Sequence, residues 1–232
     1  MNIVVTGASK GIGREIVKYL SQNPEHKIFA VSRSKENLES LKRECKFPDK
    51  LLIFNTDLTK DLSSSEFYQK IKEEDHIDIL INNAGMLINK PFMELSEQDW
   101  KSVFEVNLFS IVKLIQFLVP KLEKSNPAHI VNIGSMGGME NSSKFTGLSA
   151  YSASKASLAN LTQCLAEELK ENNIHCNCLN LGAVDTEMLQ QAFPGYRATT
   201  SPEEMAAFIA DFATNYGRLM NGKILPVSAS TP

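Results

Sequence analysis

The sequence contains no block of basic residues and no long hydrophobic run. Its 24 Lys and Arg residues face 27 Asp and Glu residues, for a net charge of -3, so the concentrated positive charge of a nucleic-acid-binding surface is missing. The longest apolar stretch, 111–119, is interrupted by Lys113 and Gln116 and is far shorter than the ~20 residues that a membrane-spanning helix needs. We therefore expect neither a nucleic-acid partner nor a membrane span, and a small-molecule partner is favoured.

Cysteine and histidine are also scarce, with four of each. Neither set has the spacing of a disulfide framework or a zinc site, so the cysteines are interpreted as small buried hydrophobic residues and no metal is expected. The chain starts directly on an apolar run at residues 3–5, which leaves no room for a charged leader with a cleavage site. We expect a cytoplasmic location.

Short apolar, β-branched runs recur seven times, and longer segments with helical periodicity lie between them. Alternating strands and helices predict a doubly wound parallel sheet that is covered by helices on both faces, because parallel connections need long crossovers. No internal repeat or linker interrupts the pattern, so a single α/β domain over residues 1–232 is expected. The predicted strands are Asn2–Val5, Lys27–Ser32, Leu51–Asn55, Ile77–Ile81, His129–Ile133, Ile174–Asn180 and Lys223–Val227.

Four serines stand where helix N-caps are expected. The first precedes a charged amphipathic stretch, the second and third are followed by an acidic residue within three positions, and the fourth is followed by a proline and two glutamates. Each of these patterns favours a helix start. The predicted caps are Ser34, Ser63, Ser96 and Ser201.

The segment 6–13 reads Thr-Gly-Ala-Ser-Lys-Gly-Ile-Gly and joins the first strand to an apolar helix. Glycine is useful here at three points: for a tight turn, for close approach of the backbone to a pyrophosphate, and for helix-to-strand contact. The helix N-terminus would then bind phosphate through its free N–H groups. The spacing Gly-x-x-x-Gly-x-Gly predicts a Rossmann-like dinucleotide cradle, with an ordinary glycine turn as the alternative.

The end of the second strand bears on the choice of dinucleotide. An Asp or Glu about 20 residues beyond the glycines would bind the 2'-hydroxyl of NAD, but this chain has Ser32 and Arg33. Arginine suits the 2'-phosphate of NADP, and Lys10 could add a second cation. A surface Lys or Arg is usually only solvated, so the prediction of NADP rests on both cations together and on the missing acid.

Tyr151 and Lys155 are four residues apart, and therefore neighbours on one helix face. Tyr68 and Lys72 have the same spacing, but they lie in a segment of Ser, Glu, Gln and Lys that is typical of a solvated helix. Tyr151 instead follows a strand and lies among small residues, which permit close approach of another molecule. We identify Tyr151 and Lys155 as the candidate catalytic pair.

With several other spaced motifs, these residues resemble the short-chain dehydrogenases/reductases along the whole chain. The motifs are the loop 6–13, Asp57-Leu58, Asn-Asn-Ala-Gly at 82–85, Asn107, Ser135, and Tyr151 with Lys155. The resemblance is to the 3-oxoacyl-ACP reductase-like and sepiapterin reductase-like branch. It implies an NADPH-dependent oxidoreductase that moves a hydride between the nicotinamide and a carbonyl or alcohol carbon.

The resemblance also implies a role for each candidate. Tyr151 would be the general acid or base, Ser135 would hold the substrate oxygen, and Asn107 would relay protons. Lys155 would bind the nicotinamide ribose and lower the Tyr151 pKa, since a charge about 4 Å away is equivalent to roughly three pKa units. The implied cofactor-binding residues are Gly7, Ser9, Lys10, Gly11, Ile12, Gly13, Ser32, Arg33, Asp57, Leu58, Asn83, Ala84, Gly85, Tyr151, Lys155, Gly182, Val184 and Thr186.

Plainer interpretations stay open for three of these. Ser135 could be a turn serine after Gly134, Asn107 a polar residue at a local helix kink, and the 83–85 segment a simple turn. Family members are generally dimers or tetramers built on the helices around Asn107 and Tyr151, so a homodimer or homotetramer is implied.

The sequence departs from the family in the segment 228–232, which lacks the glycine pair common in relatives and puts subunit contacts by this tail in doubt, and at two further places. Leu181 stands before Gly182 where a proline is usual, which restores a backbone N–H and loosens or re-bonds the cofactor wall. Sixteen positions separate Ser135 from Tyr151, longer than usual, and the usual count would fall on Gly138, which has no hydroxyl. An insertion at 136–146 is expected, with Ser142 and Ser143 as alternative hydroxyls.

The segment 187–200 is expected to fold over the substrate. Because this segment is short, it indicates a substrate that is small or loosely enclosed. A dinucleotide-binding regulator that has lost its chemistry is the main alternative function. An extended-type epimerase acting on nucleotide sugars is a third, for which the chain is too short to supply a substrate domain.

Overall fold

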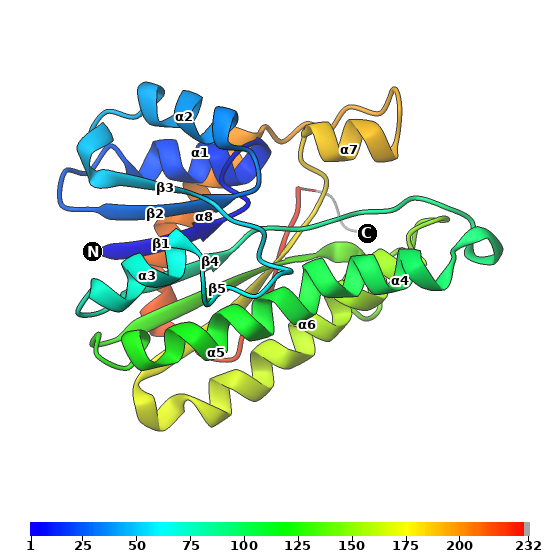
Figure 1. The fold of residues 1–232 in the computed structure, drawn as a ribbon. Coiled ribbons are helices and arrows are strands. Elements are labelled where there is room, and N and C mark those ends of the chain that lie inside the picture. The colour runs from blue at the N-terminus through cyan, green and yellow to red at the C-terminus, as the bar shows by residue number, and fades with distance from the viewer. Residues whose placement is uncertain (230–232) are drawn as a thin grey trace.

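The computed structural model describes residues 1–229, without the side chain of Arg218, and its centre is a single seven-stranded parallel sheet (Figure 1). All seven predicted strands are confirmed, with ends that shift by at most two residues. They are β1 Asn2–Thr6, β2 Lys27–Ser32, β3 Leu51–Asn55, β4 Ile79–Asn82, β5 Ala128–Ser135, β6 Ile174–Leu181 and β7 Ile224–Val227.

The strand order is β3-β2-β1-β4-β5-β6-β7. The chain thus winds outward in one direction from β1 to β3 and in the other from β4 to β7. The connections that leave β1 and β4 diverge at the carboxyl edge of the sheet, and such a switch point opens a crevice where ligands bind. The expected Rossmann-like, doubly wound architecture is confirmed.

Helices cover both faces of the sheet, as a parallel sheet requires. The helices α1, α2 and α8 lie on one face, and α3, α4 with α5, and α6 lie on the other (Figure 1). Each side encloses its own cluster of buried side chains, with Val5 and Ile16 in one and Phe29 and Leu114 in the other. The helices are α1 Gly11–Leu20, α2 Lys35–Glu44, α3 Glu66–Glu73, α4 Glu97–Phe104, α5 Ser110–Leu122, α6 Ser149–Glu168, α7 Glu187–Ala192 and α8 Pro202–Asp211.

Three of the four predicted N-caps are confirmed. The Ser34 hydroxyl accepts from the N–H of Asn37, and Ser96 and Ser201 each form a complete capping box. The prediction at Ser63 is wrong: α3 is capped by Ser65, while Ser63 donates its hydroxyl to Asp61 at 2.6 Å. The Asp61 carboxylate binds the Ser63 hydroxyl, so the helix is capped two residues later, by Ser65.

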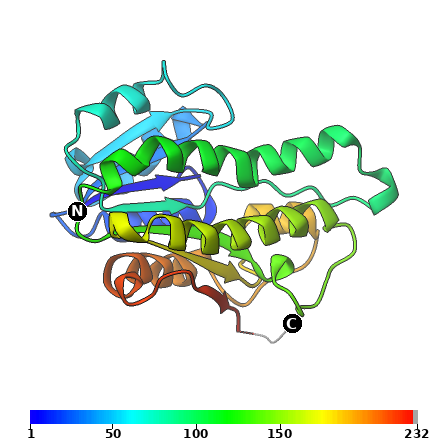
Figure 2. The ribbon, with the colours of Figure 1, turned by 90° about the horizontal axis from the view of Figure 1, so that it is seen from below.

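A π turn at Glu105–Phe109 joins α4 to α5 in one continuous helix, which lies beside α6 under the sheet (Figure 2). This helix, residues 97–122, is long and apolar enough to cross a membrane by length and composition alone, since an 18-residue window within it has a mean hydropathy of 1.6. Its apolar side has a partner within the protein, because Ile111, Leu114 and Leu118 are buried in the core. The absence of a membrane span stays a prediction.

Candidate active site

A cavity of about 520 Å³ opens at the carboxyl edge of the sheet. Its walls come from the turns that follow β1, β2, β3 and β4, the ends of β5 and β6, and the helices α6 and α7. Every residue that the resemblance implies as catalytic or cofactor-binding lines this cavity, except Gly13 and Asn107. The structure therefore brings together candidate residues that are up to 179 positions apart, from Gly7 to Thr186.

The three glycines of the loop after β1 have different tasks. A Cβ on Gly7 would lie 2.8 Å from the Ala84 Cα, and one on Gly13 would lie 2.3 Å from the Gly7 carbonyl oxygen. Both positions thus need glycine for close packing. Gly11 has a φ of +54° and only Thr186 within 4 Å, so its backbone is left open toward the cavity. The N-terminus of α1 begins at this residue.

The turn after β4 is fastened to the glycine loop through Thr6. The Thr6 hydroxyl accepts from the N–H groups of Asn83 and Ala84, each at 3.0 Å, and the Asn83 side chain donates to the Thr6 carbonyl at 3.0 Å. The 83–85 segment is therefore more than a simple turn. Its side chain and backbone hold one wall of the cavity against the other. Sequence reasoning placed Thr6 in the loop but missed this role.

Ser9, Ser32, Arg33 and Asp57 gather at one end of the cavity. The Ser32 hydroxyl donates to the Ser9 hydroxyl at 2.6 Å, and Arg33 is exposed at the rim. Burial raises the pKa of the Asp57 carboxyl, but hydrogen bonds from Thr59, aided by the Arg33 charge, outweigh it and leave that pKa below its usual 3.8. This end of the cavity is thus lined by two hydroxyls, one guanidinium and one carboxylate.

Lys10 does not point freely into the cavity. Its ammonium forms an ion pair with Glu187 at 3.3 Å, which links the glycine loop to the first residue of α7. Both side chains are more than half exposed, so the pair is weak. Sequence reasoning missed Glu187, because the two residues are 177 positions apart and neither has a local signal for the other.

Tyr151 lies half-buried on the cavity wall near the first turn of α6. Burial raises the pKa of its phenol above the ordinary value of 10.0, and the Ser135 hydroxyl acts in the opposite direction. The Ser135 Oγ also accepts from the N–H of Gly137 at 3.2 Å, as a turn serine would. The structure brings Ser135 and Tyr151 together, but the expected fall in the Tyr151 pKa is not found.

Lys155 explains that difference. Its Nζ donates to the Ile133 carbonyl at 2.7 Å and lies 5.9 Å from the centre of the Tyr151 ring. The residue is only 3% exposed, and burial lowers the pKa of its ammonium to about 8. The lysine therefore stays charged at neutral pH but is aimed at a strand carbonyl and not at the phenol oxygen.

Asn107 is fully buried in the π turn between α4 and α5. Its Oδ1 accepts from the Met86 N–H at 2.8 Å, and its Nδ2 donates to the Met86 carbonyl and to the Ser154 hydroxyl, both at 2.9 Å. The side chain is thus behind the cavity wall and fastens residue 86 to α6. This position agrees with a polar residue at a helix irregularity, and the part of Asn107 in a proton relay stays a prediction.

The segment after β6 is bonded into the sheet. Leu181 pairs with Ser135 on one side and Val227 on the other, so the position that usually holds proline is an ordinary strand residue here. Gly182 lies so close to Ser228 that a Cβ would be 2.4 Å from its hydroxyl. The Thr186 hydroxyl caps α7 by accepting from Leu189. Of the two consequences expected from Leu181 in place of proline, a looser cofactor wall or a differently bonded one, the structure has the second.

The insertion expected at 136–146 lies in the loop between β5 and α6. Gly138 packs against α6, where a Cβ would lie 2.7 Å from the Ala156 nitrogen, so this position cannot carry a hydroxyl side chain without a shift. The Ser142 hydroxyl is used inside the loop, donating to the Met136 carbonyl at 2.5 Å, and Ser143 is exposed. Among the candidate hydroxyls, the structure brings only Ser135 into the cavity lining that it describes.

Within residues 1–229, no group of three His, Cys, Asp or Glu side chains is arranged to hold a metal ion. The four cysteines are unpaired thiols; Cys45, Cys176 and Cys178 are buried and Cys164 is exposed. Three of the four thus agree with their interpretation as buried hydrophobic residues.

Comparison with known proteins gives likenesses along nearly the whole chain. A family model described as short chain dehydrogenase matches residues 1–197. The fatty acyl-CoA reductase of Acinetobacter baylyi is 34% identical over 229 residues, 93% of this chain and 76% of that protein. The 3-oxoacyl-[acyl-carrier-protein] reductase FabG of Thermotoga maritima is 29% identical over 236 aligned residues, 97% of this chain and 94% of that one.

The fold has equally close counterparts. The crystal structure of a 3-ketoacyl-(acyl-carrier-protein) reductase from Brucella melitensis, complexed with NADH, superimposes with a TM-score of 0.88 at 22% identity. The match covers 99% of this chain and 97% of that one.

Proposed function

Since the chain belongs to the short-chain dehydrogenase family, we propose that it is an NADPH-dependent oxidoreductase that transfers a hydride between the nicotinamide and a carbonyl or alcohol carbon. The observation that carries the proposal is the common cavity. One continuous space is lined by the glycine loop at one end and by Ser135, Tyr151 and Lys155 further along. A phosphate cradle and a proton donor thus face the same volume.

The cradle fits a dinucleotide. Gly7 and Gly13 pack so closely that no Cβ could be added, while Gly11 keeps its backbone open toward the cavity at the N-terminus of α1. Exposed N–H groups at a helix N-terminus bind phosphate without a cationic side chain. Asp57, Leu58 and the 83–85 segment would hold the adenosine half, and Gly182, Val184 and Thr186 the nicotinamide half.

The proposal of NADPH over NADH rests on the rim of the cavity. Ser9, Ser32 and Arg33 offer two hydroxyls and a guanidinium where NAD enzymes carry an acid. Lys10 can contribute if it leaves Glu187, which a surface ion pair permits at small cost. The Brucella structure holds NADH, but at 22% identity that likeness concerns the fold, so the side chains of this chain decide the proposal.

Each residue of the site would have its own role in the reaction. NADPH, when bound, supplies the hydride. The Tyr151 phenol donates its proton to the substrate oxygen, and its raised pKa keeps it protonated at neutral pH, as the donor in a reduction must be. The Ser135 hydroxyl holds the substrate oxygen. Lys155, whose Nζ lies 5.9 Å from the centre of the Tyr151 ring, would bind the nicotinamide ribose.

Asn107 then has a positioning role. Through Met86 and Ser154 it joins the segment after β4 to α6, which carries both Tyr151 and Lys155. The side chain acts on the geometry of the site and does not touch the reacting atoms.

Replacement of Tyr151 by phenylalanine tests the proposal. NADPH oxidation is followed by absorbance against a panel of ketones and aldehydes, and cofactor binding by nicotinamide fluorescence. Loss of the proton donor should lower kcat about 100-fold or more, with NADPH binding retained. Tyr68→Phe is the matched control, since Tyr68 has the same spacing to a lysine but stacks on Phe117 far from the cavity lining, and it should leave kcat within about twofold.

One observation favours a second function, a dinucleotide-binding regulator without chemistry: Lys155 donates to a backbone carbonyl and not to the phenol. If NADPH binds to the wild type while no carbonyl compound or alcohol is turned over, the chain is a dinucleotide-binding regulator and the enzymatic proposal fails.

The proposal includes a cytoplasmic location and a homodimer or homotetramer. Support for the assembly comes from the outer side of α5 and α6, where a shallow groove of about 520 Å³ is lined by Leu108, Val112, Leu161 and Cys164, among others. Apolar side chains on two adjacent helices suit an interface between copies.

A further inference from the structure

The loop between β5 and α6 is braced by its own polar groups. The Lys144 ammonium donates to the carbonyl oxygens of Gly137 at 3.1 Å and Met139 at 2.5 Å, and to the Ser142 hydroxyl at 2.9 Å. A lysine that satisfies three acceptors within one loop fixes the conformation of that loop. The residue that follows, Phe145, is therefore presented from a rigid support.

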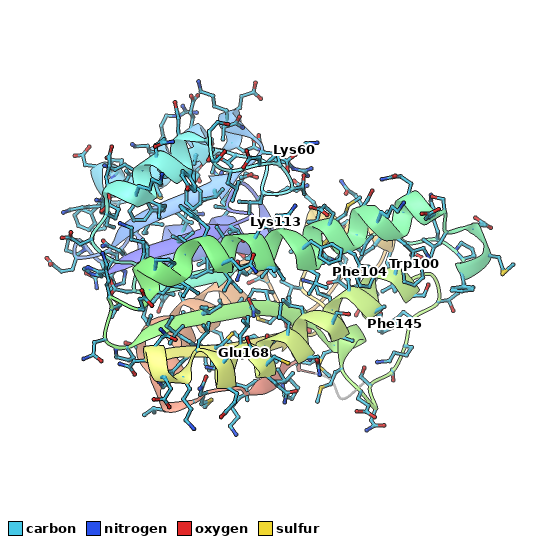
Figure 3. All side chains as sticks on the ribbon, turned by 60° about the horizontal axis from the view of Figure 1, so that its bottom comes forward. Lys60, Trp100, Phe104, Lys113, Phe145 and Glu168 are labelled. Carbon is cyan, nitrogen blue, oxygen red and sulfur yellow. The ribbon has the colours of Figure 1, made fainter. Side chains whose placement is uncertain are left out.

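Phe145 lines the cavity at the end where Phe193 follows α7. Its ring lies 6.2 Å from the ring of Phe193 in an edge-on arrangement, although its side chain is 57% exposed. The same end is tied down by two further bonds, from the Asn89 side chain to the Ala192 carbonyl at 2.7 Å and from the Lys90 N–H to the Gly147 carbonyl at 3.1 Å. Figure 3 shows Phe145 at the end of the molecule that also carries Trp100 and Phe104.

Apolar and aromatic side chains line the cavity around α7. We call them the apolar wall: Leu87, Phe145, Met188, Leu189, Phe193 and Tyr196. They come from three separate segments, after β4, before α6 and within and after α7. Such a surface offers contact area to a hydrocarbon chain or ring and few hydrogen-bond partners to a polar group.

Few of the residues that line the cavity are charged. Of the described lining residues, five are charged: Lys10, Arg33, Asp57, Lys155 and Glu187. Lys10 and Glu187 pair with each other, Arg33 and Asp57 are neighbours at the ends of β2 and β3, and Lys155 bonds to the Ile133 carbonyl. A carboxylate or phosphate placed against the apolar wall would lose water without gaining a counter-charge.

We infer that the substrate is a ketone or aldehyde whose carbonyl carries an uncharged hydrocarbon chain or ring, and that Phe145 is a specificity-determining residue which holds this group against Phe193. The inference rests on the proposed function for the identity of the reacting carbonyl. It excludes short 2-oxo acids and polyhydroxy ketones as good substrates, because their polar groups would have to lie on the apolar wall.

A homologous series tests it. Methyl ketones with alkyl chains from two to eight carbons are compared with 2-oxo acids of equal chain length, both by kcat/KM with NADPH and by calorimetric binding to the protein with NADP⁺. In the wild type kcat/KM should rise about two- to fourfold per methylene, and the 2-oxo acids should be at least about tenfold poorer. Phe145→Ala should flatten the chain-length dependence and leave the KM for NADPH unchanged.

Phe92→Ala is the matched control. Phe92 is also an exposed aromatic residue of this end, at 66% exposure, but it packs on Trp100 and does not line the cavity, so its removal should keep the chain-length dependence. Equal kcat/KM along the series, a preference for 2-oxo acids, or the same slope in Phe145→Ala would overturn the inference while leaving a working oxidoreductase. If no carbonyl is reduced at all, the proposed function fails, and the chain-length dependence of binding decides the inference alone.

Discussion

Lys155 should lower the stability of the folded protein, because its charged side chain is buried. Its ammonium is 3% exposed, and burial lowers its pKa from the ordinary 10.5 to about 8. Because one pKa unit corresponds to roughly 1.4 kcal/mol, keeping this lysine charged at neutral pH disfavours the folded state by about 3 kcal/mol. A methionine of similar length carries no charge and fills irregular space well. We therefore predict that Lys155→Met is more stable than the wild type and loses activity.

The size of the gain follows from two opposing contributions. Removing the charge contributes about 3 kcal/mol, while loss of the hydrogen bond to the Ile133 carbonyl, 2.7 Å long, takes back about 1 kcal/mol. The net gain of about 2 kcal/mol corresponds to a rise in Tm of roughly 4 to 8 °C for a chain of this size. Thermal unfolding of the protein without cofactor at pH 7, followed by circular dichroism, measures it.

The stability difference between Lys155→Met and the wild type should depend on pH, and the sign of this dependence can be predicted. A lysine whose pKa is lowered on folding binds fewer protons in the folded than in the unfolded state, so wild-type stability rises with pH between about 8 and 10.5. The advantage of Lys155→Met should be full below pH 8 and should shrink by more than half near pH 10. Lys72→Met, at an exposed lysine over the Tyr68 ring, should change stability by less than about 0.5 kcal/mol at either pH. A variant that is less stable than the wild type at pH 7, or an advantage independent of pH, would refute the reasoning.

Three further predictions concern cofactor, substrate and assembly. Arg33→Asp should move the ratio of kcat/KM for NADPH to that for NADH toward NADH by at least about tenfold, because an acid replaces the cation at the rim; an unchanged ratio in steady-state kinetics contradicts this. Ser135→Ala should lower kcat about 100-fold, whereas Ser142→Ala should disturb only the loop; near-normal turnover of the Ser135 variant would show that the wrong hydroxyl was chosen. Leu161→Glu should convert the oligomer to a monomer in light scattering behind size-exclusion chromatography, and a monomeric wild type would remove the proposed interface.

The strands could be read from the sequence because a parallel sheet buries both faces. Its strands then appear as short apolar runs, and the helical segments between them leave one economical topology. The ends were less certain for a physical reason visible at Ile77. This residue is fully buried like a strand residue, but its N–H bonds to the Lys121 carbonyl at the end of α5, so strand pairing begins only at Ile79.

The sequence predicts which residues come together at the site, but it does not predict which side chains contact one another there. Loop residues that follow strands of a parallel sheet meet at one edge, so Gly7, Asn83, Ser135 and Gly182 had to converge. The partner of a long side chain is set by whatever lies near its end in space. Lys10 meets Glu187 and Phe145 meets Phe193 only because α7 folds back over the cavity. No local pattern in either segment reports the other.

The direction of Lys155 shows how such a contact changes the chemistry. The four-residue spacing fixes the Cβ of Lys155 near that of Tyr151, but the ammonium sits at the end of four more rotatable bonds. A buried charge must be hydrogen-bonded, and the Ile133 carbonyl, on the strand beneath, is the acceptor that this ammonium reaches. Burial therefore governs the Tyr151 pKa and keeps the phenol protonated. It follows that Lys155 and Tyr151 should respond differently to mutation: removal of the lysine changes stability and activity together, whereas removal of the Tyr151 hydroxyl should change activity almost alone.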